Sequence, residues 1–292
     1  MITHNNSSFN PPILSLKQTL QSGFEEDFGF GDISSTILPD KLIKGEFIAK
    51  ADGVISGVDS ILLGYQILDE TVEVQHMVHD GDHVEQGDCI ARVDGSVRAL
   101  LTSERVILNI LQHLSGIATK TSLAVKELEG SRTRVCDTRK TLPGLRALQK
   151  YAVRCGGGFN HRMRLDDGVM IKDNHIAAAG SISKAVELAR KQAGLMVKVE
   201  VECETEAQVM EAIDSGADII MLDNQTPESA KKLTALIPDR IIIELSGGMT
   251  SETIGKFKNC GAHYISIGSV THSVSALDIS FMLSGTIKNV NG

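Results

Sequence analysis

The 292-residue sequence has no excess of basic residues and no long apolar run. Its 29 lysines and arginines are outnumbered by 37 aspartates and glutamates, which leaves a net charge of -8. This balance argues against a general surface for nucleic acids or anionic membranes. No apolar stretch approaches the ~18 residues of a membrane span, and the polar start "MITHNNSSFNPP" lacks the basic and apolar parts of a signal peptide. We therefore expect a cytoplasmic protein that binds neither nucleic acid nor membrane.

Several common motifs are also missing. The five cysteines (Cys89, Cys136, Cys155, Cys203 and Cys260) include no C-x-x-C pair, which argues against a disulfide framework and a zinc ribbon. The phosphate-loop pattern G-x-x-x-x-G-K-[ST], a strand-linked G-x-G-x-x-G, the G-x-S-x-G elbow and H-E-x-x-H do not occur. These absences argue against the usual nucleotide-binding, serine hydrolase and zinc protease classes.

The first part of the chain has the pattern of a small domain that follows a flexible segment over residues 1–13. A short helix is indicated by "PPILSLKQTLQSGFEEDFG", and alternating apolar residues between D-G and Q-G-D turns predict a mostly antiparallel sheet over 45–101, with one helix near 61–68. The turns are similar to those of lipoyl and biotinyl carrier domains. No lysine lies between Lys50 and Arg98 to carry a cofactor, so we ascribe this similarity to shared turn chemistry.

The next segment, "TSERVILNILQHLSGIATKTSLAV", has apolar residues at helical spacing, with Ser103 as the predicted N-cap. Arg105 then falls in the first turn, where a cation opposes the helix dipole by ~0.3–1 kcal/mol. On helix position alone, Arg105 is either a solvated surface residue or held there for an anion.

From residue 134 onward, short apolar segments alternate with helical patterns, which predicts a parallel sheet. Polar or glycine residues close nearly every segment instead of clustering at one point, so an α/β barrel is favoured over an open doubly wound sheet. The residues that close the segments are Arg139, Lys172, Glu202, Asp223, Ser246 and Gly268.

Basic residues concentrate between Arg132 and His175, where ten lysines and arginines and four aspartates give a local charge of +6. We expect Arg146, Lys150 and Arg154 on one solvated helix face. By contrast, Arg139, Lys140 and Lys172 stand at strand ends, where barrel enzymes place their chemistry.

A helix start is predicted beside these cations, with Thr141 as the N-cap and Pro143 in the first turn. Its free N–H groups would attract a carboxylate or phosphate. A second anion site is suggested by Ser246, Gly247 and Gly248, because glycine lets backbone N–H groups approach phosphate oxygens.

Two acidic residues complete the predicted site. Glu202 and Asp223 follow neighbouring strands and could bind Mg²⁺ or accept hydrogen bonds from a sugar diol. Together with the cations and the glycine turns, they suggest a substrate with several carboxylates or phosphates and a ribose.

These residues resemble a known family. The segment "DTRKTLPGLRALQKYAVRCGGGFNHRMRLDDGVMIKDNHI" is similar to the signature of the quinolinate phosphoribosyltransferases, also called carboxylating nicotinate-nucleotide pyrophosphorylases. The segments "EDFGFGDISSTIL", "SERVILNILQHLSGIAT", "IIMLDN", "ELSGG" and "SIGSVTHS" also occur in the family's order. Leu142 and Phe159 depart from the pattern, where threonine and histidine are common, but neither change removes a charge.

The resemblance implies an N-terminal α/β sandwich domain over 14–116, an incomplete α/β barrel over 117–274, and a segment over 275–292 that packs back on the first domain. It implies transfer of phosphoribose from 5-phosphoribosyl 1-pyrophosphate to quinolinate with decarboxylation. The products would be nicotinate mononucleotide, pyrophosphate and CO2, in de novo NAD biosynthesis. Mg²⁺ is the implied cofactor, and a homodimer or higher homo-oligomer is the implied assembly.

The resemblance also implies the role of each site residue. Quinolinate would be held by Arg139, His161, Arg162 and Lys172, with Arg105 reaching in from a neighbouring subunit. Lys140 and Lys172 would contact the phosphoribosyl donor, Glu202 and Asp223 the ribose hydroxyls and the metal, and Ser246, Gly247, Gly248 and Gly268 the 5-phosphate. The implied catalytic residues are Lys140, Lys172, Glu202 and Asp223.

Two other functions compete with this one. A Schiff-base lyase could use Lys140 or Lys172, since lysines at strand ends also serve aldolases, but the surrounding arginines do not suit a lysine that must be neutral. An anion-binding or carrier protein is the non-enzymatic alternative. The missing carrier lysine and the acidic pair Glu202 and Asp223 weigh against it.

Overall fold

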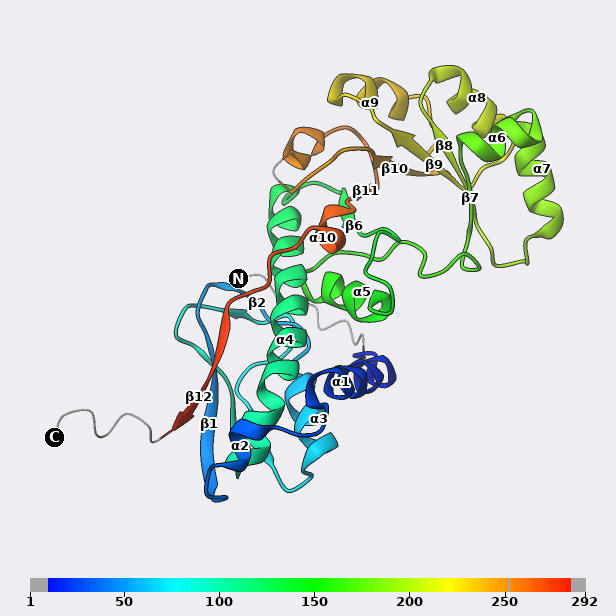
Figure 1. Cartoon of the computed structure of the whole chain (residues 1–292). Coiled ribbons are helices and arrows are strands. Elements are labelled where there is room, and N and C mark those ends of the chain that lie inside the picture. Colours follow the sequence, from blue (N-terminus) through cyan, green and yellow to red (C-terminus); the bar gives the residue numbers. More distant parts are fainter. Residues whose placement is uncertain (1–9, 252, 285–292) are drawn as a thin grey trace. The chain divides into compact units, whose positions relative to one another are not determined.

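The computed structural model describes residues 10–251 and 253–284 (Figure 1). They form two compact units. Unit 1 contains the described residues of Met1–Lys120, Leu142–Gly157 and Ser273–Gly292, and unit 2 contains those of Thr121–Thr141 and Gly158–His272. The flexible segment predicted over 1–13 falls mostly on residues 1–9, which lie outside the described residues.

Unit 1 combines antiparallel sheets with helices. The larger sheet has the order β12-β1-β5-β3, and β2 pairs with β4. The strands are β1 (Leu42–Ala49), β2 (Gly53–Val54), β3 (Glu73–His76), β4 (His83–Val84), β5 (Cys89–Ser96) and β12 (Ile279–Ser284). The helices are α1 (Ile13–Phe28), α2 (Ile33–Thr36), α3 (Asp59–Leu68), α5 (Arg146–Cys155) and α4 (Val97–Glu127), whose last turns belong to unit 2. The predicted antiparallel sheet and its helix are confirmed, except that 97–101 belong to α4.

Helix spacing explains the core of unit 1. Leu16, Leu20 and Phe24 follow one another at intervals of four along α1 and are all buried, as expected for the apolar stripe of an amphipathic helix. On α3, a Cβ atom at Gly64 would lie 2.5 Å from the Ile107 side chain of α4. Only glycine therefore allows these two helices to approach this closely.

The long helix α4 begins earlier than predicted. It starts at Val97, directly after β5, so Ser103 is not its N-cap and Arg105 is not in its first turn. The Ser103 hydroxyl donates to the Ala99 carbonyl at 2.8 Å within the helix. The argument from the helix dipole therefore does not apply to Arg105. None of the described helices, α4 included, is long and apolar enough to cross a membrane.

The predicted helix start at Thr141 and Pro143 is wrong. Helix α5 begins at Arg146, and the backbone N–H of Leu142 donates to the Gln149 side chain at 3.0 Å. The Gln149 side-chain oxygen, from within the helix, thus accepts from a backbone N–H that precedes the helix. The predicted helix therefore does not begin at Thr141, directly after Arg139 and Lys140.

Helix α5 groups with unit 1, although the predicted barrel over 117–274 included it. Its Tyr151 hydroxyl donates to Asp80 at 2.8 Å, and the Gln149 amide contacts the His113 ring at 2.8 Å. Lys150 is fully buried, so the prediction that it lies on a solvated helix face is also wrong.

Unit 2 contains a parallel six-stranded sheet in the order β6-β11-β10-β9-β8-β7. Its strands are β6 (Arg134–Cys136), β7 (Val169–Ile171), β8 (Val199–Cys203), β9 (Ile219–Asp223), β10 (Ile242–Ser246) and β11 (Tyr264–Ser266). Consecutive strands are neighbours from β7 to β11, and the first strand, β6, pairs with the last. This is the order of a barrel with one open side between β6 and β7, which confirms the predicted incomplete α/β barrel.

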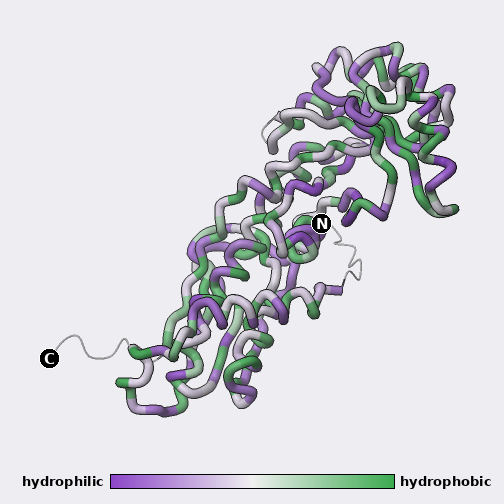
Figure 2. The backbone as a smooth tube through the Cα atoms, turned by 45° about the vertical axis from the view of Figure 1, so that its right-hand side comes forward, coloured by the Kyte–Doolittle hydropathy of each residue, from purple (hydrophilic) through white to green (hydrophobic). Residues whose placement is uncertain are grey.

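The helices of unit 2 follow its strands. They are α6 (Asp173–Ala179), α7 (Ile182–Gln192), α8 (Glu206–Asp214), α9 (Pro227–Thr234), the 3-10 helix η1 (Ile254–Phe257) and α10 (Ser269–His272). Ser181, Thr205 and Thr226 cap α7, α8 and α9 with their side chains, as N-cap preferences predict. In Figure 2 the strands of this unit are mostly hydrophobic, whereas the helices alternate in hydropathy.

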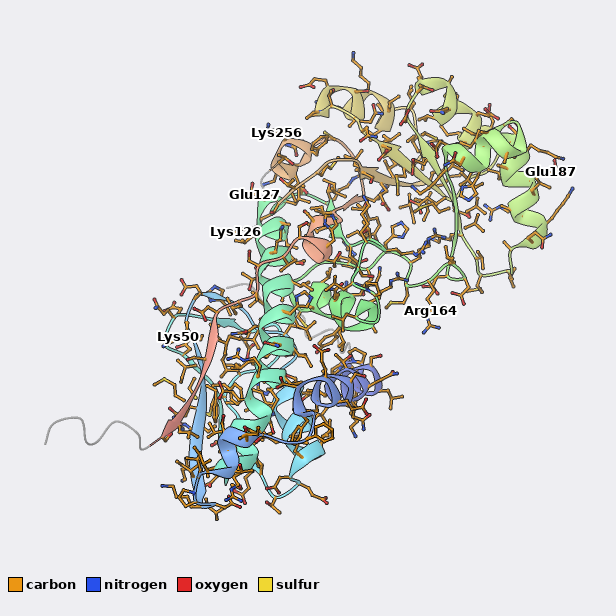
Figure 3. All side chains as sticks on the ribbon, viewed as in Figure 1. Lys50, Lys126, Glu127, Arg164, Glu187 and Lys256 are labelled. Atoms are coloured by element: carbon orange, nitrogen blue, oxygen red, sulfur yellow. The ribbon has the colours of Figure 1, made fainter. Side chains whose placement is uncertain are left out.

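The outer surface of α7 is charged. Glu187 lies on it and pairs with Lys184 at 2.9 Å and with Lys191 at 2.5 Å (Figure 3). The side chains of Lys184, Glu187 and Lys191 are 50%, 46% and 64% exposed to solvent. This ion pair therefore belongs to the solvated face of the helix, away from the sheet.

The open side of the barrel is partly covered by the segment around Phe159. The Phe159 N–H donates to the Val135 carbonyl at 2.8 Å, and the Asp137 N–H donates to the Phe159 carbonyl at 3.0 Å. Arg162 follows, and its guanidinium donates to the Gly168 carbonyl at 2.7 Å, next to the start of β7. Residues 159–162 thus connect the β6 edge to the β7 edge.

Candidate active site

The sheet of unit 2 gathers polar side chains on one face near the carboxyl ends of its strands. In the parallel register, Asp223 is the partner of Ser246 and Glu202 is the partner of Met221. Because side chains alternate between the two faces of a strand, Glu202, Asp223 and Ser246 share one face. Glu200, two residues before Glu202, lies on the same face but deeper.

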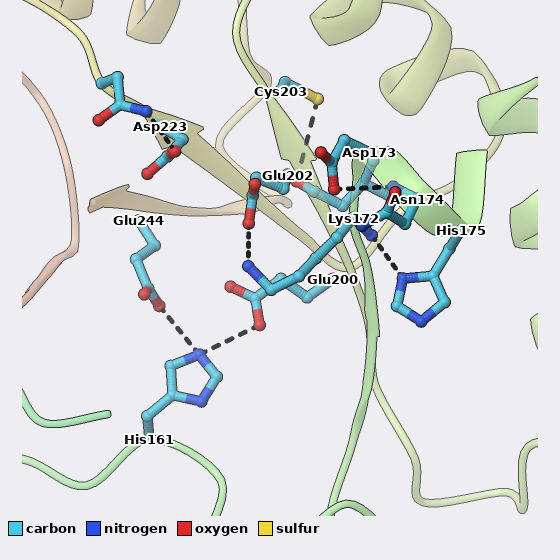
Figure 4. A network of polar contacts seen from close by, with 12 residues as sticks. His161, Lys172, Asp173, Asn174, His175, Glu200, Glu202, Cys203, Asp223 and Glu244 are labelled. Carbon is cyan, nitrogen blue, oxygen red and sulfur yellow. Dashed lines mark hydrogen bonds and ion pairs between the residues drawn. The ribbon is translucent and has the colours of Figure 1, made fainter. Parts of the chain in front are cut away.

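The first contact at this edge joins two predicted residues. The Lys172 ammonium, directly after β7, forms an ion pair with the Glu202 carboxylate on β8 (Figure 4). The Lys172 side chain is 44% exposed and that of Glu202 is 15% exposed. A charged lysine and its carboxylate therefore stand together at the carboxyl end of two adjacent strands.

A tight turn adjoins Asp223. Gly247 and Gly248 have φ angles of 96° and 59°, in the left-handed region that favours glycine. A Cβ atom at Gly247 would lie 2.3 Å from the Asn224 side-chain oxygen and 2.5 Å from the Asn224 backbone nitrogen. Asn224 itself has a φ of 54°, and its amide donates to Asp223 at 2.7 Å. The predicted phosphate turn is thus packed against Asn224, which links it to the predicted acidic residue Asp223.

Lys140 and Gly268 also lie together, because β6 and β11 are neighbours. A Cβ atom at Gly268 would lie 2.9 Å from the Lys140 side chain. The Thr271 hydroxyl donates to the Lys140 carbonyl at 2.8 Å and links the same two segments. The Lys140 side chain remains exposed.

Two arginines carry unused donors. Among the described residues, Arg139 Nε and Arg162 Nε are buried and have no hydrogen-bond acceptor. Burial lowers the pKa of Arg162, and the charge of nearby Arg139 lowers it further. Two guanidinium groups in this arrangement repel each other unless an anion lies near both, and buried donors without acceptors are costly. The pair is therefore suited to binding an anion.

His161 sits deeper, between two glutamates that the sequence analysis did not identify. Its Nε2 atom lies 3.1 Å from Glu200 Oε2 on β8 and 3.4 Å from Glu244 Oε2 on β10 (Figure 4). Glu200 and Glu244 are only 3% and 4% exposed. We call His161, Glu200 and Glu244 the buried triad. In the described part of the chain it is the one group of three possible metal-ligating side chains with ligand atoms within 4.8 Å of one another.

The charge of each member of the buried triad depends on the other two. Burial favours the neutral imidazole, but hydrogen bonds to Glu200 and Glu244 outweigh it and raise the pKa of His161 to about 10. Burial also raises the pKa of Glu200. The Arg162 backbone N–H points at His161 Nδ1 from 2.7 Å, a contact that requires an unprotonated Nδ1. Both carboxylates face the same Nε2–H, which the neutral ring also carries, so the structure shows Nε2 as the donor and Nδ1 as the acceptor, while the two glutamates favour uptake of a further proton.

A sequence signal for the two missed glutamates exists. In "VEVEC", Glu200 is two residues before Glu202, and in "IIIELS" Glu244 is two residues before Ser246. Each glutamate therefore points to the same face of its strand as the predicted site residue. A carboxylate inside an apolar strand needs a partner. That partner, His161, comes from a segment with no regular secondary structure, which the strand pattern alone does not indicate.

All predicted site residues except Arg105 belong to unit 2. Their contacts form four groups: Lys172 with Glu202, Asp223 with the glycine turn through Asn224, Lys140 with Gly268, and His161 with Arg162. Arg105 lies on the α4 helix of unit 1 and is exposed.

The chain matches known proteins over nearly its whole length. The family model "Quinolinate phosphoribosyl transferase, N-terminal domain" matches residues 32–115, and the corresponding "C-terminal domain" model matches residues 117–282. A curated relative from Bacillus subtilis (strain 168), "Probable nicotinate-nucleotide pyrophosphorylase [carboxylating]", is 50% identical over 268 residues, or 91% of this chain and 93% of the relative. The "Nicotinate-nucleotide pyrophosphorylase [carboxylating]" of Mycobacterium leprae (strain TN) is 38% identical over 283 residues, or 91% of this chain and 96% of the relative.

Solved structures agree with these relatives. "Crystal Structure of NadC from Streptococcus pyogenes" has a TM-score of 0.91 and 43% identity, and the match covers 95% of this chain and 99% of that one. "Structure of the nicotinate-nucleotide pyrophosphorylase from Francisella tularensis" has a TM-score of 0.90 and 35% identity, covering 94% and 98%. From its two domain matches and these relatives, the chain belongs to the quinolinate phosphoribosyl transferase family.

Proposed function

We propose that this protein transfers phosphoribose from 5-phosphoribosyl 1-pyrophosphate to quinolinate with decarboxylation. The products are nicotinate mononucleotide, pyrophosphate and CO2, and the reaction serves de novo NAD biosynthesis. Family membership and the names of the relatives support this reaction. The observation that carries it in the structure is the pair of buried Nε donors of Arg139 and Arg162, which have no acceptor among the described residues.

The quinolinate dicarboxylate would bind these arginines. Arg139 and Arg162 offer donors for planar, two-point contacts with carboxylates. Lys172 and His161 would supply further positive charge, and Arg105 would come from a neighbouring subunit. The exposed position of Arg105 on α4 is compatible with such a contact.

The phosphoribosyl donor would lie along the carboxyl edge of the sheet. Glu202 and Asp223 would accept hydrogen bonds from the ribose hydroxyls. The 5-phosphate would bind the turn formed by Ser246, Gly247 and Gly248, together with Gly268. Lys140 and Lys172 would contact the pyrophosphate side. The close packing of Gly247 on Asn224 supports this arrangement, because it places the glycine turn next to Asp223.

Mg²⁺ fits the donor set. Glu202 and Asp223 provide carboxylate oxygens, the ligands that this ion prefers. They stand on adjacent strands and share one face. When bound there with the substrate, the ion would neutralise charge on the pyrophosphate group.

The residues themselves account for the electrostatics of the transfer. As pyrophosphate leaves, positive charge develops on the ribose, and Glu202 and Asp223 would stabilise it. Lys140 and Lys172 would stabilise the negative charge on the leaving group. After ribosylation the pyridine nitrogen is cationic and withdraws electrons from the C2 carboxylate. The bond from C2 to its carboxylate then breaks, the electron pair stays on C2 beside the cationic nitrogen, and C2 takes up a proton from solvent. This step needs no separate organic cofactor, while Arg139 and Arg162 would hold the remaining carboxylate.

The test is turnover with both substrates. Purified protein with Mg²⁺ should release CO2 from carboxyl-labelled quinolinate and form nicotinate mononucleotide only when both substrates are present. Arg162→Gln should raise the quinolinate KM, while Lys191→Gln, on the outer face of α7, serves as the matched control. Absence of nicotinate mononucleotide from folded, Mg²⁺-supplied protein would contradict the proposal.

The lyase alternative is not favoured. A Schiff-base lysine must be neutral to attack a carbonyl, yet the Lys172 ammonium is paired with the Glu202 carboxylate. Such a partner stabilises the charged amine and opposes nucleophilic attack.

The homodimer and the cytoplasmic location remain parts of this proposal. Support for the first comes from exposed apolar side chains in unit 1, among them Phe30, Ile33 and Ile37, since such groups are common at interfaces. Support for the second comes from the five cysteines, which form no disulfide in the structure. Light scattering on purified protein would measure the assembly directly, and a monomer would contradict it.

A further inference from the structure

The buried triad links three separate parts of unit 2. Glu200 lies on β8 and Glu244 on β10, with β9 between them, and both reach the same nitrogen of His161. The His161 backbone N–H donates to the Asp137 carboxylate at 2.8 Å, just after β6. His161 is therefore held from the β6 end, from β8 and from β10.

The ring also fixes the next residue. Its Nδ1 atom lies 2.7 Å from the Arg162 backbone nitrogen, so the imidazole packs against the start of Arg162. The Arg162 guanidinium is anchored on the far side by the Gly168 carbonyl. Its Nε donor has no acceptor among the described residues. A shift of the His161 ring would therefore move the backbone that carries this donor.

Stability does not explain why two carboxylates are buried here. Buried ionic groups usually stabilise a protein no better than apolar side chains of the same size. In addition, Glu200 Oε1 and Glu244 Oε1 are buried without a hydrogen-bond partner in residues 10–251 and 253–284. Such under-satisfied groups are retained mainly where a site needs them.

We propose that Glu200 and Glu244 are positioning residues for the quinolinate subsite, where together they fix His161 and, through it, Arg162 against the substrate dicarboxylate. This inference rests on the proposed function, and it assigns a role to two residues that contact substrate only through others. Neither glutamate is needed for the donor subsite formed by Asp223, Ser246 and the glycine turn.

A metal ion in the buried triad is the competing explanation. Zinc ligands at about 2.1 Å from the ion would lie about as far apart as the atoms of this group. However, the distances of 3.1 and 3.4 Å are also those of hydrogen bonds. Arg162 interacts with Glu200, and its charge would repel a divalent cation. We therefore favour the hydrogen-bonded arrangement.

The experiment uses two pairs of variants in the full-length protein. Glu200→Met and Glu244→Met keep the side-chain length but remove the acceptor, whereas Glu200→Gln and Glu244→Gln keep an acceptor oxygen. We expect the methionine variants to raise the quinolinate KM by about tenfold, the scale of one lost hydrogen bond in a site. The KM for 5-phosphoribosyl 1-pyrophosphate should change less than about twofold, and the glutamine variants should recover part of the loss.

Matched controls separate positioning from general damage. Glu211→Met removes a carboxylate from α8 that bonds only Ser183 in the described structure and should leave both KM values unchanged. Nitrogen-detected NMR of the His161 ring should show altered shifts in the glutamine variants, which preserve the fold best. This readout keeps the inference testable if a methionine variant does not fold.

The outcomes are distinct. If the wild-type protein turns over and the variants keep the wild-type quinolinate KM and His161 shifts, the inference is overturned while the proposed function stands. Equal increases in both KM values would assign a purely structural role and also overturn it. If wild-type protein contains stoichiometric zinc and the Glu200→Met variant does not, the inference is overturned and the buried triad is a metal site. Wild-type protein that forms no nicotinate mononucleotide would overturn the proposed function itself.

Discussion

The two layers of charge in unit 2 differ in burial and in what holds them. The outer layer contains Lys172 and Glu202, and the Lys172 side chain is 44% exposed. The inner layer is the buried triad, in which Glu200 and Glu244 are almost inaccessible. Water can screen and replace the contacts of the outer layer, whereas the inner layer depends on its own partners. The outer layer is thus suited to exchanging partners with substrate, and the inner layer to holding geometry.

The largest effect on stability is expected from removing His161, the one cation of the inner layer. His161→Leu leaves Glu200 and Glu244 buried next to each other without a counter-charge, and we expect a loss of about 3–5 kcal/mol in the free energy of unfolding. The measurement is denaturant unfolding at neutral pH. The triple variant His161→Leu/Glu200→Met/Glu244→Met should recover most of that loss without recovering activity. If the triple variant is as unstable as His161→Leu, the buried carboxylates are not the cause of the instability of His161→Leu.

The outer layer was predictable from the sequence because it lies where strands end. Lys172, Glu202 and Asp223 each follow or close an apolar segment, so the barrel pattern alone places them at one edge. The role of Gly247 was equally predictable, since a glycine pair after a late strand indicates a left-handed turn. The fold itself followed from the alternation of strands and helices.

The inner layer was not predictable in the same way. Glu200 alternates with apolar residues like any edge carboxylate, and only the sheet register and His161 reveal that it is buried. Two local signals were also misleading. Thr141 and Pro143 resemble a helix start, but Gln149 captures the Leu142 N–H and the helix begins at Arg146. Lys150 has the spacing of a solvated face, yet tertiary packing buries it.

Removing the cation of the outer layer should affect catalysis more than folding. Lys172→Met deletes an ammonium that we place next to both substrates, and the loss of one such group costs about 10²–10³ in kcat. Steady-state kinetics with Mg²⁺ measures this effect. Lys184→Met removes a lysine with a similar carboxylate contact on the outer face of α7 and should leave kcat unchanged. Equal losses in both variants would show that Lys172 acts only through stability.

The pH dependence of stability sharpens the contrast between the layers. The His161 pKa of about 10 lies above its ordinary value of 6.5. The contribution of the imidazolium to stability is therefore complete below pH 6.5 and is lost as the pH rises through about 10. The loss should be smaller than that of His161→Leu, because a neutral ring can still donate one hydrogen bond. Unfolding should be followed from pH 6 to 10.5 and compared with the triple variant, which lacks this dependence. A wild-type curve that parallels the triple variant throughout would contradict the raised pKa of His161.

The glycine turn of the outer layer can be tested with two matched glycines. Gly247 and Gly180 have φ angles of 96° and 94°, but a Cβ atom at Gly247 would meet Asn224 at 2.3 Å, whereas Gly180 has open space. Both alanine variants incur the strain of a left-handed φ, about 1 kcal/mol or more. Only Gly247→Ala must also displace Asn224, and with it Asp223. We expect it to raise the KM for 5-phosphoribosyl 1-pyrophosphate, with Gly180→Ala as the control. If Gly180→Ala raises the KM for 5-phosphoribosyl 1-pyrophosphate as much as Gly247→Ala does, displacement of Asn224 is not the cause.

The smallest effect is expected at the ion pair outside both layers. Hydrogen bonds from Lys191 and Lys184 lower the pKa of Glu187 to about 2. Nevertheless, Glu187 lies on the solvated side of α7 (Figure 3), where water and salt screen charges and long side chains lose entropy when they pair. Glu187→Gln should therefore leave thermal unfolding and kcat unchanged within error, at both low and high salt. A clear loss of stability at low salt would show that contact geometry alone can dominate over exposure. The distinction between the two layers would then depend on partners and not on burial.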